Sequence, residues 1–118
     1  MPDRRDVDRR APETAELRRL RRRIDALDKR IVAMLNERAS LAREAGAAKT
    51  AAGRRAIRDA EREREVLLRV SMANAGPLPQ ADLLALYRRL FVATRALEAR
   101  DRDQAARGDG GPADHHRD

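Results

Sequence analysis

The sequence predicts an all-α protein with three helices of unequal length, and three observations support that prediction. Apolar residues recur at alternating steps of three and four over most of the chain. No segment alternates apolar and polar residues as a half-buried strand does. Two internal segments interrupt the helical pattern, Thr50–Arg58 with Gly53 and the breaker Asn74–Pro79. These signals divide the chain into a long, a short and a medium helix.

The long helix is predicted over residues 14–50. This stretch has no proline and a single glycine. Its apolar seam consists of Leu17, Leu20, Ile24, Leu27, Ile31, Met34, Leu41, Ala45 and Ala48. At about 1.5 Å per residue, the helix is roughly 55 Å long, more than one chain of this size can cover. We therefore expect a homodimer in which two chains wrap together as an intertwined helical bundle.

The two later helices are predicted over residues 60–74 and about 80–103. Asp59 stands at the N-cap position of the short helix, and Glu61 and Glu63 fall in its first turn, where the helix dipole favours negative charge. The charged ends, 1–12 and 105–118, contain almost no large apolar residues and are expected to be disordered tails. Residues 13–104 then form one helical domain.

The composition restricts the class of protein. There is no cysteine and no apolar run long enough to cross a membrane, so a cytoplasmic protein without a membrane partner is expected. The formal charge of +7 favours an anionic partner. Tyr87 and Phe91 are the only aromatic residues, too few for a platform that stacks single-stranded nucleic acid, so nucleic acid is not predicted as the partner.

Arg38 interrupts the apolar seam of the long helix between Met34 and Leu41. One interpretation is a structural residue that pairs with an acid of a neighbouring helix or extends to water. The other is a polar cavity that holds an anion. Lys49 lies about three turns further on the same face, about 16 Å from Arg38 along the axis, so two long side chains can close on a small ligand.

Other polar residues near the seams have equally simple structural interpretations. Arg21 lies about 25 Å from Arg38 along the helix and can join the same site only from a partner chain, or else is a solvated residue. Thr94 and Glu98 share a face of the third helix, and a threonine there often bonds to the preceding turn. His115 and His116 have no further ligands nearby, so no metal site is predicted.

Over about residues 14–100, the chain resembles the all-helical chorismate mutases. The resemblance rests on the spacing of several short motifs. They are Leu20-Arg21, Ile24-Asp25, Leu27-Asp28, Leu35-Asn36-Glu37-Arg38, Gly46-Ala47-Ala48-Lys49, Arg58-Asp59 and Arg62-Glu63. It implies the rearrangement of chorismate to prephenate, an isomerase reaction of the shikimate pathway that requires no cofactor.

The resemblance also implies a role for each matching residue. Arg38 and Arg21 of the partner subunit would bind the two carboxylates of chorismate. Lys49 would reach a carboxylate and the ether oxygen, which Glu98 would face in its neutral form. Asp59, Arg62 and Glu63 would line the side of the ring hydroxyl, and Thr94 would lie near the ring carboxylate.

Four alternatives stay open at this point. A gapless alignment of the third helix would place Glu98 where the family has serine. The same fold is compatible with an aminodeoxychorismate mutase, which rearranges the 4-amino analogue, or with an isochorismate pyruvate lyase. A basic helical protein that binds nucleic acid or a partner helix belongs to a different class and predicts salt-sensitive binding without mutase activity.

Overall fold

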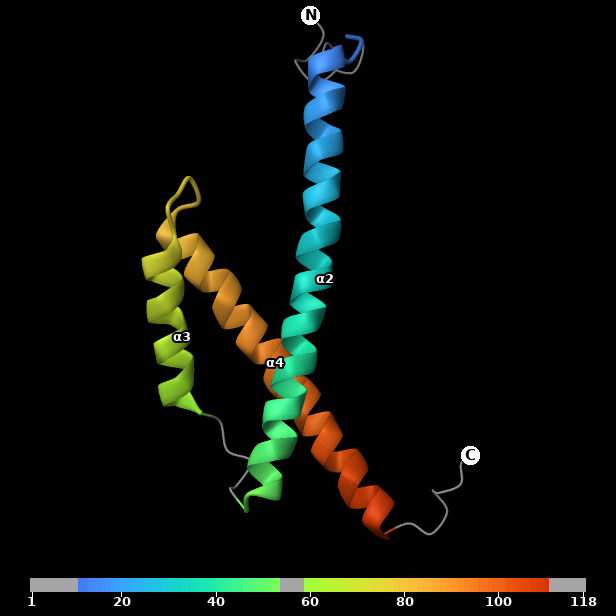
Figure 1. Ribbon diagram of the computed structural model, residues 1–118, viewed down its shortest axis with the longest axis vertical. Coiled ribbons are helices and arrows are strands. Elements are labelled where there is room, and N and C mark those ends of the chain that lie inside the picture. Colours follow the sequence, from blue (N-terminus) through green and yellow to red (C-terminus); the bar gives the residue numbers. More distant parts are fainter. Residues whose placement is uncertain (1–10, 54–58, 111–118) are drawn as a thin grey trace, which may run out of the picture. The chain divides into compact units, whose positions relative to one another are not determined.

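The computed structural model describes residues 11–53 and 59–110, and these form three helices, α2, α3 and α4 (Figure 1). No strand occurs in these two segments, so the all-α prediction is confirmed. Most of the two predicted tails, with His115 and His116, lies outside the described residues, as does the segment 54–58. No helix within the described segments is long and apolar enough to cross a membrane.

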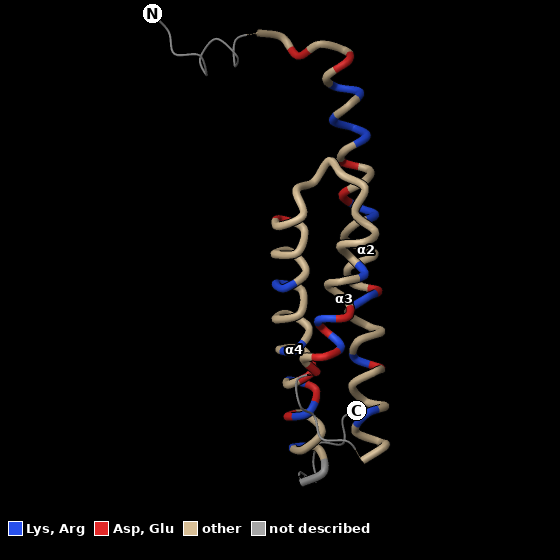
Figure 2. The backbone as a smooth tube through the Cα atoms, turned by 90° about the vertical axis from the view of Figure 1, so that its left-hand side faces the viewer, with Lys and Arg blue, Asp and Glu red and all other residues tan. Residues whose placement is uncertain are grey.

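Helix α2 covers Ala15–Ala51, within one residue of the predicted range at each end. The hydroxyl of Thr14 accepts a hydrogen bond from the Leu17 N–H at 3.0 Å and so caps the first turn. At the other end Gly53 has a φ of +79°, the left-handed conformation in which helices commonly stop. Basic residues are frequent along α2 (Figure 2).

Helix α3 covers Ala60–Ala73, and Asp59 caps it as predicted. The Asp59 carboxylate accepts a hydrogen bond from the Arg62 N–H at 2.9 Å. In the turn that follows, the Asn74 side-chain amide donates to the carbonyl of Leu78 at 3.1 Å and to the side-chain oxygen of Gln80 at 2.9 Å. These bonds close a tight connection, so α3 and α4 form a helical hairpin (Figure 1).

Helix α4 covers Gln80–Gly110 and ends seven residues beyond the predicted end at 103. Residues 105–110 are therefore helical, which corrects the expectation that a disordered tail begins at 105. The reason is local, because Gln104, Ala105, Ala106 and Arg107 all favour a helix and no proline interrupts them before residue 112.

The chain divides into two compact units, Met1–Arg38 and Ala39–Asp118. In the second unit, Phe91 of α4 is the only buried hydrophobic residue among those described, with 7% of its surface exposed, and it meets Tyr87 edge to face at 6.4 Å between ring centroids. Val66, Leu67 and Val70 of α3, the helix that packs on α4, are half-buried. Along α2, by contrast, the apolar seam is exposed, as at Ile24 (54%) and Met34 (62%).

Candidate functional site

The C-terminal part of α2 crosses α4 at Gly46, where two of the predicted site residues lie. A Cβ placed on Gly46 would lie 3.5 Å from Cγ and Cδ of Glu98 and 3.6 Å from its Oε2. The carboxyl group of Glu98 therefore lies beside Gly46, within van der Waals reach of a methyl group placed there. Lys49 lies one turn beyond Gly46 on the same helix face and is half-buried. Lys49 and Glu98 thus both lie within one helix turn of this crossing.

A second contact holds this crossing together outside the predicted site. Arg43 donates two hydrogen bonds to the Asp101 carboxylate, from Nε at 2.9 Å and from Nη2 at 2.8 Å. The hydrogen bonds from Arg43 lower the pKa of Asp101, and the same pairing raises the pKa of Arg43. This two-pronged geometry links α4 to the part of α2 that follows Arg38.

Glu63 is largely enclosed, with 16% of its side chain exposed. Its Oε2 accepts a hydrogen bond from Nη1 of Arg95, an ion pair that joins α3 to α4. The residue before Arg95 is Thr94, which is half-buried on α4 one turn before Glu98. Glu63, Thr94 and Glu98 therefore belong to one packed unit with Lys49.

Sequence reasoning overlooked Arg95. Arg95 is a cation at helical spacing from apolar residues. The same pattern singled out Arg38 and would have identified Arg95 as well. Arg95 follows the buried Phe91 by four residues and so lies along the same side of α4. A charge so close to a core residue requires a partner, and Glu63 is one.

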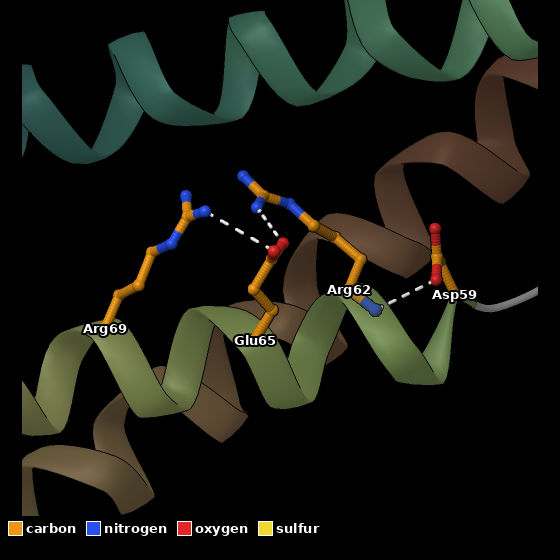
Figure 3. Close-up of polar contacts among 4 residues, drawn as sticks. All are labelled: Asp59, Arg62, Glu65 and Arg69. Atoms are coloured by element: carbon orange, nitrogen blue, oxygen red, sulfur yellow. Dashed lines mark hydrogen bonds and ion pairs between the residues drawn. The ribbon is translucent and has the colours of Figure 1, made fainter.

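Asp59 and Arg62 take part in contacts at the start of α3 (Figure 3). One oxygen of Asp59 caps the helix. The guanidinium of Arg62 donates to Glu65 at 2.6 Å, and Arg69 approaches the other oxygen of Glu65 at 3.4 Å. The hydrogen bond from Arg62, with the positive charge of Arg69, lowers the pKa of Glu65. Arg62 is exposed, so its side chain has room to exchange this partner for a ligand.

The remaining two predicted residues, Arg21 and Arg38, lie in the N-terminal unit. Arg21 is exposed and pairs with Glu13 of the same chain at 2.6 Å. Arg38 is half-buried although the apolar residues before it on the seam are exposed. The six other predicted residues, Lys49, Asp59, Arg62, Glu63, Thr94 and Glu98, all belong to the second unit.

This set of side chains consists of cations, carboxyl groups and a hydroxyl. Such groups hold an anion by charge and donate hydrogen bonds to oxygens that gain negative charge. The arrangement suits a reaction that depends on binding geometry and electrostatic stabilisation.

Comparisons with known proteins identify the same reaction family. Residues 20–99 match the family model of chorismate mutase type II. The chain is 39% identical over 87 residues to a bifunctional chorismate mutase/prephenate dehydratase of Aquifex aeolicus, a match that covers 70% of this chain and 24% of that protein. For the protein of the same name from Stutzerimonas stutzeri, the identity is 38% over 90 residues, covering 73% and 25%.

A solved structure shares the fold at significant sequence identity. The form II structure of chorismate mutase from Thermus thermophilus superposes with a TM-score of 0.67 at 32% identity, and the match covers 72% of this chain and 96% of that one. The chain spans about a quarter of the length of the curated relatives it matches. With a family model that matches residues 20–99, the chain belongs to the chorismate mutase type II family.

Proposed function

We propose that this chain is a chorismate mutase, which converts chorismate to prephenate without a cofactor. The observation that carries the proposal is the extent of the family match, because residues 20–99 include all eight candidate site residues, from Arg21 to Glu98. The named relatives are chorismate mutases with a second activity, and the chain corresponds to about a quarter of their length.

The proposed reaction breaks a carbon–oxygen bond and forms a carbon–carbon bond within one molecule. It needs no nucleophile, so the enzyme must hold a flexible dianion in a compact geometry and stabilise charge on the ether oxygen. Arg38 and Arg21 of the partner subunit bind the two carboxylates. The half-burial of Arg38 supports a role in a site, because a solvated arginine would extend to water.

Lys49 and Glu98 act on the ether oxygen. Their position at one crossing of α2 and α4 supports this pairing, since Glu98 packs against Gly46 one turn from Lys49. Lys49 supplies a positive charge, and Glu98 donates a hydrogen bond from its protonated form. Glu63 accepts the hydrogen bond of the ring hydroxyl, Asp59 and Arg62 line the same side of the ring, and Thr94 donates to the ring carboxylate.

The active unit is a homodimer. Support comes from the exposed seam of α2, in which Leu27 and Ile31 are half exposed in the single chain. A chain with one buried hydrophobic residue among those described has little core of its own, and a second copy would bury the seam. Arg21 lies too far along the helix to reach the site of its own chain. Dimerisation would bring Arg21 of the partner subunit to that site instead.

The test is to incubate the purified chain with chorismate, follow the loss of its absorbance and identify the product. Prephenate is expected. Lys49→Ala and Arg38→Ala should each lower kcat/KM by about 10² or more, since each removes a preorganised charge. Lys29→Ala, an exposed lysine of the same helix, is the matched control and should leave kcat/KM unchanged.

Each alternative has its own outcome in this assay. Pyruvate as a product from isochorismate would indicate the lyase, and faster turnover of the 4-amino analogue would indicate an aminodeoxychorismate mutase. No turnover, together with salt-sensitive DNA binding, would indicate the basic interaction protein. Near-normal activity of Lys49→Ala or Arg38→Ala would remove the proposed site.

A further inference from the structure

Arg95 pairs with an acid that the proposed function places at the substrate ring. Its guanidinium donates to Oε2 of Glu63 across the hairpin of α3 and α4, and the two side chains are 34% and 16% exposed. Partial burial matters because charges in a partly desolvated site interact more strongly than on the open surface. Glu63 therefore does not present an isolated negative charge.

The pairing changes which ring substituent Glu63 can favour. A carboxylate that is not compensated attracts an ammonium group by its charge and a hydroxyl group only by a hydrogen bond. With a guanidinium already at the same carboxylate, a second cation meets repulsion, whereas a neutral hydroxyl still finds an acceptor oxygen. The pair is thus suited to a hydroxyl donor and unfavourable to an amine.

We propose that Arg95 is a specificity-determining positioning residue, which acts through Glu63 to favour chorismate over its 4-amino analogue. The proposal rests on the proposed mutase function and deepens it, since it assigns a role to a residue outside the eight candidates. Arg95 orients the Glu63 carboxylate from α4 and offsets its charge. Discrimination against the amine then depends on the packing of α3 against α4, which brings Arg95 to Glu63.

The experiment measures kcat/KM for chorismate and for 4-amino-4-deoxychorismate with the full chain. The wild-type protein is expected to prefer chorismate. Arg95→Met should lower the ratio of the two kcat/KM values by about tenfold or more, the effect of a close charge pair in a partly buried setting. Arg95→Lys keeps the charge and should retain most of the preference. Should Arg95→Met fail to fold, Arg95→Gln carries the same expectation as Arg95→Met.

Arg43→Met is the matched control, because it breaks another ion pair between helices, that of Arg43 with Asp101, and leaves the pair of Arg95 with Glu63 unchanged. It is expected to change thermal stability but not the ratio. If Arg95→Met and Arg43→Met both shift stability while the ratio stays constant, Arg95 only clamps α3 to α4 and the proposal is wrong. A wild-type preference for the amine overturns it as well. Absence of any mutase activity in the wild-type protein instead overturns the proposed function, and this proposal with it.

Discussion

Glu98 has the most demanding chemical role among the proposed site residues. A carboxylate that faces an ether oxygen would oppose the negative charge that grows there, so Glu98 can help only while it holds a proton. Lys49, one turn beyond the glycine that Glu98 touches, has no such requirement. In the proposed mechanism, Lys49 thus supplies a positive charge and Glu98 supplies a hydrogen bond from a neutral group.

These roles predict the effects of two substitutions at Glu98. Glu98→Gln should keep most of kcat/KM because the amide still donates a hydrogen bond, whereas Glu98→Ala removes the donor and should lower kcat/KM by about 10² or more. Glu44→Gln, at an exposed glutamate of α2, is the control and should leave kcat/KM unchanged. Wild-type activity of Glu98→Ala would contradict the role and favour the gapless alignment of the third helix.

At the scale of the helices, Gly46 is where α2 allows α4 to come close. A methyl group added there would meet Glu98 at 3.5 Å, an ordinary van der Waals separation. A larger side chain would have to take the space that Glu98 occupies. Substitutions at Gly46 can therefore test two effects separately. One is the cost of a glycine within a helix, and the other is the need for space at the crossing.

We predict that Gly46→Ala stabilises the protein by up to about 1 kcal/mol, the difference in helix propensity, with activity retained. Gly46→Leu should lower both stability and kcat/KM because it displaces Glu98. Thermal unfolding and the chorismate assay distinguish the two effects. Loss of activity in Gly46→Ala would mean that the crossing is closer in the working enzyme than in this structure.

The pair between Arg43 and Asp101 makes a further prediction about the crossing of α2 and α4. Because the hydrogen bonds from Arg43 lower the pKa of Asp101 in the folded chain, the pair stabilises the fold above the ordinary aspartate pKa of 3.8. That contribution is lost as the pH falls through the lowered pKa. Arg43→Gln should therefore reduce Tm near neutral pH, and the difference from wild type should shrink in acid.

The measurement is thermal unfolding of both proteins from neutral to acid pH. Arg107→Gln is a suitable control because Arg107 is exposed on the last turn of α4, the helix that carries Asp101. Its Tm should follow that of the wild type at each pH. A difference between wild type and Arg43→Gln that is constant with pH would show that the ion pair adds nothing to stability.

At the scale of the whole molecule, the exposed seam of α2 and the distance between Arg21 and Arg38 lead to the same proposal, a site shared between two chains. A shared site allows a test that a site within one chain does not. Two inactive variants can restore activity in a mixed dimer when the two substituted residues reach the same site from different chains.

We predict that Arg21→Ala and Lys49→Ala homodimers are both nearly inactive and that refolding them together restores activity. Each mixed dimer then has one site with both lesions and one with neither. Lys49→Ala refolded with Arg38→Ala is the matched control and should restore nothing, because both residues serve the site from the same chain. Mixed dimers that form without recovery in the first combination would contradict the shared site.

The sequence by itself determined the features that depend on residues three or four positions apart. The helix class, the range of α2 to within one residue, the Asp59 cap and the breaker at Asn74–Pro79 all follow from local spacing and caps. The family also follows from the sequence, because its motifs are short patterns on these helices. The end of α4 was missed because helix ends fray gradually where no proline or cap marks them.

Only the tertiary structure decided which side chains meet between helices. Glu63 and Arg95 are 32 residues apart in the chain, and Arg43 and Asp101 are 58 apart, so no local pattern relates them. The contact of Glu98 with Gly46 likewise depends on where α4 crosses α2. Helix periodicity defines which face a residue occupies, but the partner of that face depends on packing, which is a property of the folded chain.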